Sequence, residues 1–533
     1  MMKYPIGIQT FSNIIQDGYV YVDKTDMVYS LANSGKIFFL SRPRRFGKSL
    51  LLSTLKSYFL GQKELFRGLK IDSLEKEWNV YPVFHLSFGT SNFTKLGTLE
   101  AVILDYIEGF EKIYGRTTNS DDYAIRFKHV IKSAHERTGQ RAVVLVDEYD
   151  KPLLDVMDDK TLYYVADNGE KITYESHNRN ILKGFYGVFK DADEDLHFVM
   201  LTGVTKFSQV SVFSGFNQPD DISMDARYES LCGITKDELL NVFDSSIHSL
   251  AAANGNDYHE TVSRLEKKYD GYHFSSNLTG IFNPFSILNC FKKNDMRNYW
   301  FASGTPGYLV RLLAHSNENI NELIGKYYPA EMFIDYKADV EQPLPMIYQS
   351  GYLTIKACNP RRQTYLLDFP NDEVRSGFIS VLAGDYFKEG RTQPATWLED
   401  VTDALQAGNV EMFMKQMTAL LSSVTYRFQR KQDAFECERY FQYTFYLIMQ
   451  MLGRYNTLVE KETSEGRIDC VLECPDYVYI LEFKLNGSAS SALEQIEDKG
   501  YAKPYMADSR KVICLGINFS SEKGTIDDWI FCN

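Results

Sequence analysis

The sequence predicts an α/β protein with an N-terminal parallel-sheet domain, a mainly helical middle region and a smaller C-terminal α/β domain. Apolar runs alternate with segments of helical spacing over residues 36–207, and from about 225 the pattern becomes mainly helical. From about 435 it reads helix, paired strands, helix and strand. Because 533 residues exceed what one hydrophobic core accommodates, we expect three regions. They span residues 1–275, 276–395 and 396–533.

The N-terminal elements follow one another as strand, loop and helix. The apolar run KIFFL meets a turn rich in Gly and Arg, and SLLLSTLKSYFL then repeats apolar residues at helical spacing. Further strands are expected at 81–88, 141–150 and 197–207, and helices at about 97–115 and 120–137. This alternation predicts a parallel sheet covered by helices on both faces.

Charge and cysteine content restrict the protein class. The formal net charge of −13 argues against a protein that binds nucleic acid over its whole surface, although it is compatible with a local basic groove. The eight cysteines form no CxxC pair, so neither a zinc ribbon nor a disulfide framework is indicated. The N-terminus lacks a leader pattern, and no apolar run approaches the ~20 residues of a membrane helix. We expect a cytoplasmic protein without a membrane partner.

The segment SRPRRFGKSL predicts a phosphate-binding loop (P-loop). Gly47, Lys48 and Ser49 stand where a strand gives way to a helix, and such a turn directs backbone N–H groups at an anion. There the lysine reaches the outer phosphates and the serine hydroxyl holds Mg²⁺. Arg42 occupies the position of the usual first glycine. Arg45 and Phe46 belong to the same expected nucleotide-binding loop.

The run VVLVDEYD supplies the expected partner of this loop. Asp147 and Glu148 follow an apolar strand, at the strand end where ligands bind in such sheets. We expect Asp147 to orient Mg²⁺ and Glu148 to polarise the attacking water of ATP hydrolysis. Solvated acids that merely end a strand are the alternative.

Two further sets of residues have less specific signals. Thr202 and Thr205, at the end of the next strand, either sense the γ-phosphate or simply finish the strand. Arg44 and Arg45 either stabilise phosphate charge or are solvated loop arginines.

A second site is expected in EGRIDCVLECPDYVYILEFKL. The alternation of a strand puts Glu482 and Lys484 on one face, and Asp469 on the neighbouring strand can project to the same place. Carboxylates that fix Mg²⁺ or Mn²⁺ against a phosphate, with a lysine that positions water, suit phosphodiester hydrolysis. An exposed hairpin with a salt bridge is the alternative.

Other residues extend this second site. No histidine follows His315, which excludes histidine-based chemistry and favours metal ligation by oxygen at Asp469 and Glu482. Glu438 precedes an expected helix stripe and either caps the helix or points to the metal. Gln495 and Tyr501 either contact the substrate backbone or belong to a polar helix face.

With these residues in view, the chain resembles a family of bacterial and archaeal proteins that join an AAA-ATPase-like region to a C-terminal nuclease domain of the PD-(D/E)XK superfamily. The resemblance rests on stretches spread over nearly the whole length: YVDKT, SRPRRFGKSLLLSTL, VLVDEYDKPL, LTGVTKFS, YDGYHF, NPFSIL, YQSGYLTIK, FPNDEVR, GRIDCVL and ILEFKL.

The resemblance implies a P-loop ATPase and a restriction-endonuclease-like C-terminal core. It implies metal ligation by Asp469 and Glu482 with Lys484 as the catalytic lysine, and it matches a helical acid to Glu438. RPRRFGKS resembles the family's own form of the phosphate loop, with Arg42 in place of glycine. The expected function is an ATP-gated, Mg²⁺-dependent nuclease acting on DNA rather than RNA. Alternatives are an ATP-dependent switch whose C-terminal domain binds without cutting, and a structural partner protein. A homo-oligomer or an unidentified protein trigger is also expected.

Overall fold

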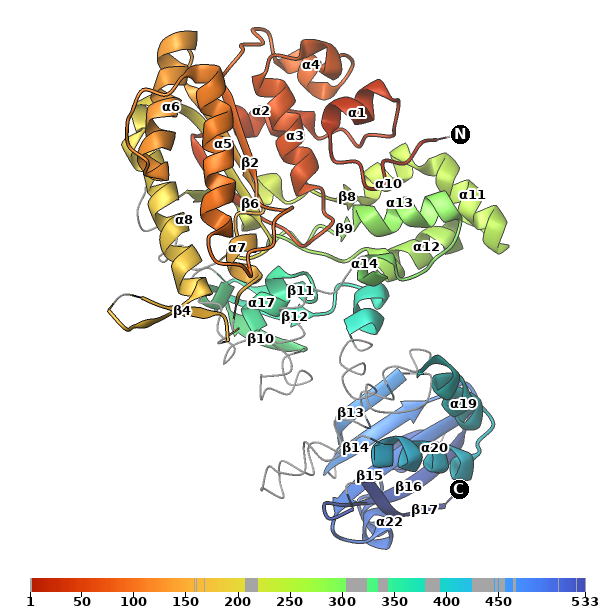
Figure 1. Ribbon diagram of the computed structural model, residues 1–533. Helices are drawn as coiled ribbons and strands as arrows, with labels where there is room; N and C mark the ends of the chain where they lie inside the picture. The colour runs from red at the N-terminus through yellow and green to blue at the C-terminus, as the bar shows by residue number, and fades with distance from the viewer. Residues whose placement is uncertain are drawn as a thin grey trace. The chain divides into compact units, whose positions relative to one another are not determined.

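The computed structural model divides the chain into two compact units, Met1–Arg375 and Ser376–Asn533 (Figure 1). It describes residues 2–157, 159, 161–166, 168–206, 219–302, 324–333, 344–378, 394–423, 445, 449, 456–463, 466–506, 508–523 and 525–532. Residues 276–375 fall within the first unit, whereas the regional boundaries expected at 275 and 395 stay predictions. None of the helices in the described part of the chain has the length and apolar character that a bilayer crossing needs.

The first unit is built on a five-stranded parallel sheet, which confirms the predicted α/β class. Its strand order is β2-β3-β6-β1-β7. All side chains of β3 are buried, as expected for a strand covered on both faces. The strands are β1 (Ile37–Ser41), β2 (Val83–Ser87), β3 (Ala142–Asp147), β6 (Leu196–Gly203) and β7 (Asp220–Asp221).

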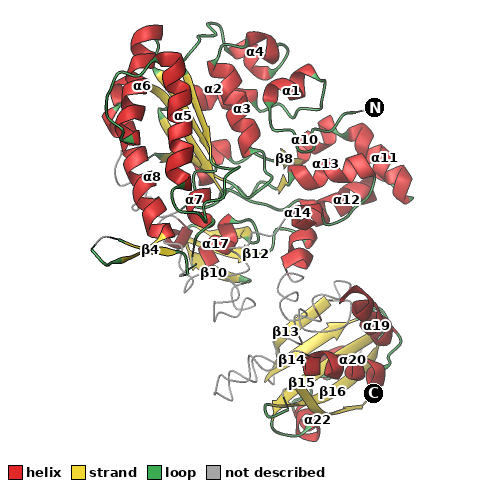
Figure 2. Cartoon of the chain, viewed as in Figure 1, coloured by secondary structure: helices red, strands yellow, loops and turns green. Residues whose placement is uncertain are grey.

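Helices cover this sheet on both sides. Helix α3 packs on one face, and the group of α5, α6 and α8 lies on the other (Figures 1 and 2). Asp122 caps α6, because its side chain accepts a hydrogen bond from the amide of Ile125. The helices of this part are α1 (Phe11–Gln16), α2 (Thr25–Ser34), α3 (Lys48–Phe59), α4 (Lys70–Leu74), α5 (Thr98–Tyr114), α6 (Tyr123–Thr138), α7 (Lys151–Leu154) and α8 (Tyr174–Asp191). A short hairpin, β4 (Tyr163–Val165) and β5 (Lys171–Thr173), precedes α8.

The remainder of the first unit is mainly helical, as predicted, but also contains small sheets. In the antiparallel sheet β10-β12-β11, β11 and β12 form a hairpin, whereas β10 joins β12, and β8 joins β9, through long-range pairing that local periodicity does not reveal. The helices are α10 (Lys236–Val242), α11 (Asp244–Asn254), α12 (Tyr258–Tyr269), α13 (Pro284–Lys293), α14 (Tyr299–Ala302) and α17 (Leu344–Gln349). The strands are β8 (Ile234–Thr235), β9 (Ile281–Phe282), β10 (Lys326–Pro329), β11 (Thr354–Asn359) and β12 (Thr364–Asp368).

The second unit is a mixed five-stranded sheet between helices, in the order β13-β14-β15-β16-β17. The helix α22 connects β15 to the parallel strand β16 and packs Ile496 against Val478 and Ile480. The opposite face packs against α19 and α20. The elements are α19 (Pro394–Gln406), α20 (Val410–Ser423), β13 (Asn456–Thr463), β14 (Gly466–Glu473), β15 (Tyr477–Leu485), α22 (Ala489–Asp498), β16 (Lys511–Ser520) and β17 (Thr525–Cys532).

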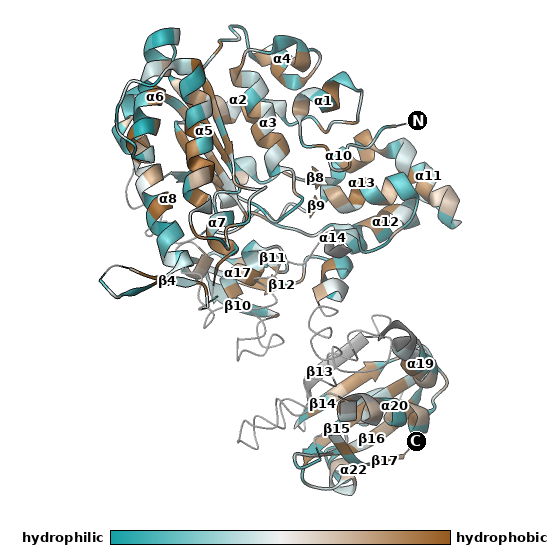
Figure 3. Cartoon of the chain, viewed as in Figure 1, coloured by the Kyte–Doolittle hydropathy of each residue, from teal (hydrophilic) through white to brown (hydrophobic). Residues whose placement is uncertain are grey.

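Close packing of α22 on the sheet depends on one glycine. A Cβ atom on Gly516 would lie 2.8 Å from the backbone nitrogen of Leu493, so a larger residue would push the helix away from the sheet. Hydrophobic residues concentrate on the central strands of this unit (Figure 3). The helix is therefore held directly above the face of β15 that carries the candidate catalytic residues.

Candidate functional site

The phosphate loop joins β1 to α3 at the predicted position. Gly47 has φ +94°, a conformation that side-chain-bearing residues rarely adopt, and it is followed by Lys48 as the first residue of α3. The first amides of a helix have no acceptor within the helix, so this turn presents N–H donors at the positive end of the helix dipole. Ser49 is half-buried in the same turn. The loop thus has the backbone form of an anion-binding turn.

Lys48 is folded back onto this loop. Its Nζ atom donates hydrogen bonds to the carbonyl oxygens of Arg42 at 2.8 Å and Pro43 at 3.0 Å. Burial lowers the pKa of Lys48, while the neighbouring acids Asp147, Asp150 and Glu148 oppose this shift. The structure therefore brings the loop lysine within electrostatic range of the acidic end of β3.

Asp147 and Thr202 form a direct pair across neighbouring strands. The Thr202 hydroxyl donates a hydrogen bond of 2.8 Å to Oδ1 of Asp147, and both side chains are buried. Strand β6, which carries Thr202, lies between β1 and β3. Thr202 is thus placed between the phosphate loop and the acidic strand end, and it fixes the Asp147 carboxylate.

Glu148 begins the turn after β3 in a strained backbone conformation. Its φ is +51°, and its carboxylate lies beside Gly89, where a Cβ atom would be 2.9 Å from Oε2. Burial and the adjacent Asp147 raise the pKa of Glu148. An elevated pKa makes this carboxylate a better proton acceptor than an ordinary glutamate.

Asp150, for which the sequence predicted no role, lies beside the same strand ends. Its buried carboxylate accepts hydrogen bonds from the amides of Val204 and Thr205, at 2.9 and 2.7 Å, and from the Thr205 hydroxyl at 2.8 Å. Thr205 therefore holds Asp150 in place and ties the turn after β3 to the end of β6. The signal for Asp150 was its position in the acidic run VDEYD.

The side chain of Arg42 contacts residues far from the phosphate loop in sequence. Its guanidinium donates to the carbonyl oxygens of Ser41, Ser223 and Tyr228 and lies 4.1 Å from the centre of the Phe274 ring. The arginine at position 42, where the usual motif has glycine, therefore leaves the turn at Gly47 open.

The other loop residues separate into exposed and buried sets. Arg44 and Arg45 are exposed, and the Arg45 guanidinium lies 5.1 Å from the centre of the Phe285 ring. Phe46 is buried against Tyr272 and Phe274 and anchors the loop.

In the second unit, Glu482, Lys484 and Gln495 form one cluster. Glu482 and Lys484 lie on the same face of β15, with Nζ and Oε1 3.8 Å apart. Gln495 of α22 bridges them: its amide nitrogen donates to Glu482, and its amide oxygen accepts from Lys484 at 2.6 Å. Gln495 thus contacts both predicted residues, which identifies its side of the helix as facing the site.

Asp469 joins this cluster from the neighbouring strand. Its Oδ2 accepts a hydrogen bond of 2.8 Å from the Phe483 amide, directly between Glu482 and Lys484 in sequence. Burial and the charge of Asp469 raise the pKa of Glu482 to about 7. Two carboxylates in a buried site repel one another unless a proton or a cation neutralises them.

The chemistry of this cluster fits a divalent cation. Among the described residues, Oε2 of Glu482 is buried and has no hydrogen-bond partner, although buried polar atoms are normally paired. Together with Asp469 it offers the hard oxygen atoms that Mg²⁺ and Mn²⁺ prefer. The described residues contain no cluster of three or more His, Cys, Asp or Glu side chains suited to a metal ion. Protein ligation there is thus confined to two carboxylates within the described ranges.

Two further residues predicted for this site, Glu438 and Tyr501, are not part of the cluster that the structure describes. Glu438 lies outside the described residues. Tyr501 is buried, and its hydroxyl donates a hydrogen bond of 2.9 Å to the carbonyl oxygen of Arg467. The hydroxyl of Tyr501 is therefore engaged in holding α22 and the following turn against β14.

Known proteins match the chain at both ends and over its length. The family described as "Predicted AAA-ATPase" matches residues 5–213, and the one described as "PD-(D/E)XK nuclease superfamily" matches residues 436–529. A relative from Azotobacter chroococcum mcd 1, described as "Uncharacterized protein in vnfD 5'region", is 35% identical over 535 residues, which cover 98% of both chains.

A solved structure, that of the Aeropyrum pernix ORC1 protein in complex with DNA, aligns with 68% of this chain and 93% of its own. Its sequence identity is 8% and its TM-score is 0.23, a score too low for the likeness to bear on fold or function. The family assignment rests instead on the sequence matches. The chain therefore belongs to the family of proteins that join a predicted AAA-ATPase domain to a C-terminal domain of the PD-(D/E)XK nuclease superfamily.

Proposed function

We propose that this protein is an ATP-hydrolysing switch that gates a Mg²⁺-dependent nuclease acting on DNA. The observation that carries the proposal is the cluster of Glu482, Lys484 and Gln495. The same chain also contains the loop at Gly47 and the acidic end of β3. The two family domains support an ATPase with a nuclease-type hydrolase at the level of the family.

In the first unit, ATP would occupy the turn at Gly47. Lys48 would exchange its two loop carbonyl partners for the outer phosphates, while the backbone amides of the turn, with Arg45 and Phe46 shaping the loop, hold the phosphate chain. Ser49 and Asp147 would hold the nucleotide's Mg²⁺, with Thr202 keeping Asp147 in position. Glu148 would accept a proton from the attacking water.

In the second unit, Asp469 and Glu482 would hold Mg²⁺, with Mn²⁺ as an alternative. When bound, the ion would supply an electrophile for the scissile phosphate. Lys484 would orient the attacking water, and Gln495 keeps the lysine beside the Glu482 carboxylate. Water adds to phosphorus, the bond to the leaving oxygen breaks, and that oxygen takes up a proton. Glu438 is proposed as a further acid of this site from the sequence alone.

A second candidate function is an ATP-dependent switch whose C-terminal unit binds nucleic acid or protein without cutting it. The net charge of −13 favours the protein-binding form of this candidate, because an acidic protein repels the phosphate backbone of nucleic acid. The retained Asp469, Glu482 and Lys484 favour cleavage, since a pure binding module has no need of a buried, unpaired carboxylate oxygen.

Gating is tested by cleavage of plasmid and oligonucleotide DNA with Mg²⁺ or Mn²⁺, in the presence of ATP, ADP or no nucleotide. Wild type is compared with Lys48→Ala, and Lys56→Ala in the same helix is the matched control. We expect ATP to change the cleavage rate of wild type and of the control, and to have no effect on Lys48→Ala. An equal ATP response in Lys48→Ala rejects gating through this loop.

A further inference from the structure

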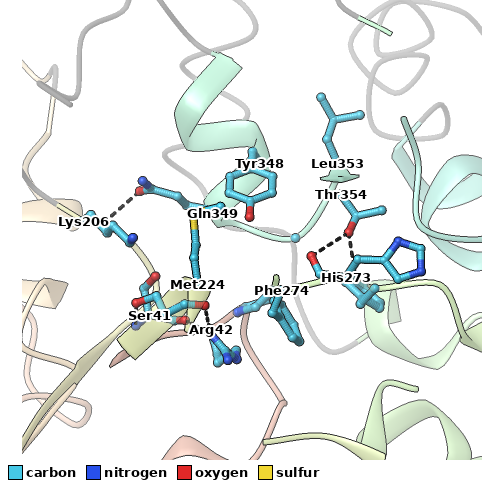
Figure 4. A pocket seen from close by; sticks show the side chains of 14 residues that line it. Ser41, Arg42, Lys206, Met224, His273, Phe274, Tyr348, Gln349, Leu353 and Thr354 are labelled. Atoms are coloured by element: carbon cyan, nitrogen blue, oxygen red, sulfur yellow. Dashed lines mark hydrogen bonds between the residues drawn. The ribbon is translucent and has the colours of Figure 1, made fainter. Parts of the chain in front are cut away.

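A small cavity lies beside the start of the phosphate loop. It is bordered by Ser41, Arg42 and Pro43, by Lys206 after β6, by the loop at Tyr272, and by Tyr348 and Gln349 of α17. Tyr348 and Gln349 lie on one side and Arg42 and Phe274 on the other (Figure 4). The space amounts to about 20 Å³, enough for one water-sized group.

Three residues that border this cavity carry buried polar atoms without hydrogen-bond partners in the described part of the chain. They are Nε of Arg42, the hydroxyl of Tyr272 and the amide nitrogen of Gln349. All three side chains are more than nine-tenths buried. Each atom can donate a hydrogen bond, and the arginine and amide nitrogens cannot accept one. These three donors therefore require a hydrogen-bond acceptor in the cavity.

The charge of the cavity is positive. No carboxylate of the described residues lies within ion-pair distance of the Arg42 guanidinium, whose partners are backbone carbonyl oxygens. No carboxylate of the described residues lines the cavity. Asp221 and Glu229 act on Arg42 electrostatically from outside the lining; Asp221 pairs with Lys206 at 2.7 Å, and Glu229 accepts from Thr279 at 2.6 Å. Burial lowers the pKa of His273, so its ring adds no charge at neutral pH. A buried arginine with no carboxylate of the described residues in direct contact favours an anionic occupant.

We propose that this cavity binds a small inorganic anion of about the size of chloride, held by Arg42, Tyr272 and Gln349. The anion would connect the start of the phosphate loop to α17. Gln349 also accepts a hydrogen bond of 2.8 Å from the Lys206 amide, so the same side chain reaches the end of β6. Larger oxyanions such as phosphate exceed the available space. The proposal does not depend on the nuclease or on ATP hydrolysis.

Thermal unfolding of the full chain at constant ionic strength tests the site, with chloride replacing gluconate. We expect a saturable rise in Tm of about 2 °C in wild type. Gln349→Glu keeps the acceptor for Lys206 but repels an anion, and Tyr272→Phe removes a donor, so both lose the rise. Tyr186→Phe, at a buried tyrosine of α8, retains it as the matched control. A linear response, or one equal in all variants, overturns the proposal.

Crystals of the wild-type chain soaked in bromide give a second, independent readout. Bromide scatters anomalously, so an occupied site gives a peak between Arg42 and Gln349, and crystals of Gln349→Glu lack it. Absence of the peak in wild type means that water satisfies these three groups and overturns the proposal, as does a peak that persists in Gln349→Glu.

Discussion

The ammonium group of Lys484 lies 3.8 Å from the carboxylate of Glu482 on one face of β15. The contact is looser than a direct hydrogen bond, because the Gln495 amide stands between the two groups and bonds to both. One oxygen of the carboxylate has no partner in the part of the chain that the structure describes, and the lysine is partly exposed. The pair is therefore bridged by Gln495, and one carboxylate oxygen is left for the cation that we propose.

Replacing Gln495 with Leu removes both of its hydrogen bonds. The bond to Gln495 lowers the pKa of Glu482, so its loss raises that pKa further. We expect the acid limb of the pH–rate profile for DNA cleavage to move to higher pH, with a rate loss of roughly 10-fold at neutral pH. Glu494→Gln, on the exposed part of the same helix, should leave the profile unchanged. A fall in rate without a shift of the profile would indicate a merely structural role.

The stability of the second unit should depend on pH through Glu482. The pKa of Glu482 is raised from 4.5 to about 7 in the folded protein. Its stabilising contribution is therefore fully present below its ordinary pKa and is lost as pH rises through 7. We expect the free energy of unfolding in metal-free buffer to fall by on the order of 2 kcal/mol between pH 5 and 8.

This pH dependence is measured by denaturation followed through tryptophan fluorescence. In Glu482→Gln the fall should disappear, because glutamine does not titrate. Saturating Mg²⁺ should restore stability at pH 8 in wild type only. Identical pH curves for the two proteins would contradict the assignment of the raised pKa to Glu482.

Restoring the usual glycine at position 42 should harm the protein. Arg42→Gly removes three hydrogen bonds to buried carbonyl oxygens and the contact with Phe274. We expect a loss of roughly 2–4 kcal/mol in unfolding free energy and no gain in ATP affinity. Denaturant titration and nucleotide binding measure the two effects. Arg44→Gly, at an exposed loop arginine, is the control and should change stability little.

Thr202→Val tests the link between β6 and β3. The variant keeps the side-chain shape but removes the 2.8 Å hydrogen bond to Asp147, so the carboxylate loses its fixed orientation. We expect ATP hydrolysis to slow by roughly 5- to 10-fold and the free energy of unfolding to fall by about 1 kcal/mol. Thr261→Val in α12 removes another buried hydroxyl that donates to the Asp257 carbonyl oxygen at 2.8 Å and should leave hydrolysis intact. Equal hydrolysis in Thr202→Val and wild type would reject this role.

The elements predicted from sequence are those whose signal is local. The strand, turn and helix around Gly47 and Lys48, the acidic end of β3, and the pairing of β14 with β15 all follow from short periodic patterns. Asp469 reaches the β15 segment that carries Glu482 and Lys484, as the period of two predicts.

The features that the sequence did not reveal depend on long-range contacts. Arg42 is stabilised by residues more than 180 positions away, so its motif position alone could not show where its side chain lies. The sequence predicts for Gln495 either a contact with the substrate backbone or a place on a polar helix face. It does not predict the contact with Glu482, because that contact depends on the packing of α22 on β15 and β16. The positions of β13 and β17 at the two edges of the sheet also depend on pairing between strands, which the sequence pattern does not show.

The most direct test of the account is metal-dependent cleavage by the full chain and by Glu482→Gln, assayed on single- and double-stranded DNA and on RNA. Glu497→Gln, an exposed residue of α22, is the matched control, and ATP binding by each variant shows that the first unit is intact. We predict that wild type and the control cut DNA with Mg²⁺ or Mn²⁺, and that Glu482→Gln is slower by at least ~100-fold. If wild type cuts nothing while ATP is still bound and hydrolysed, or if Glu482→Gln cuts as fast as wild type, the cluster on β15 is not a nuclease site.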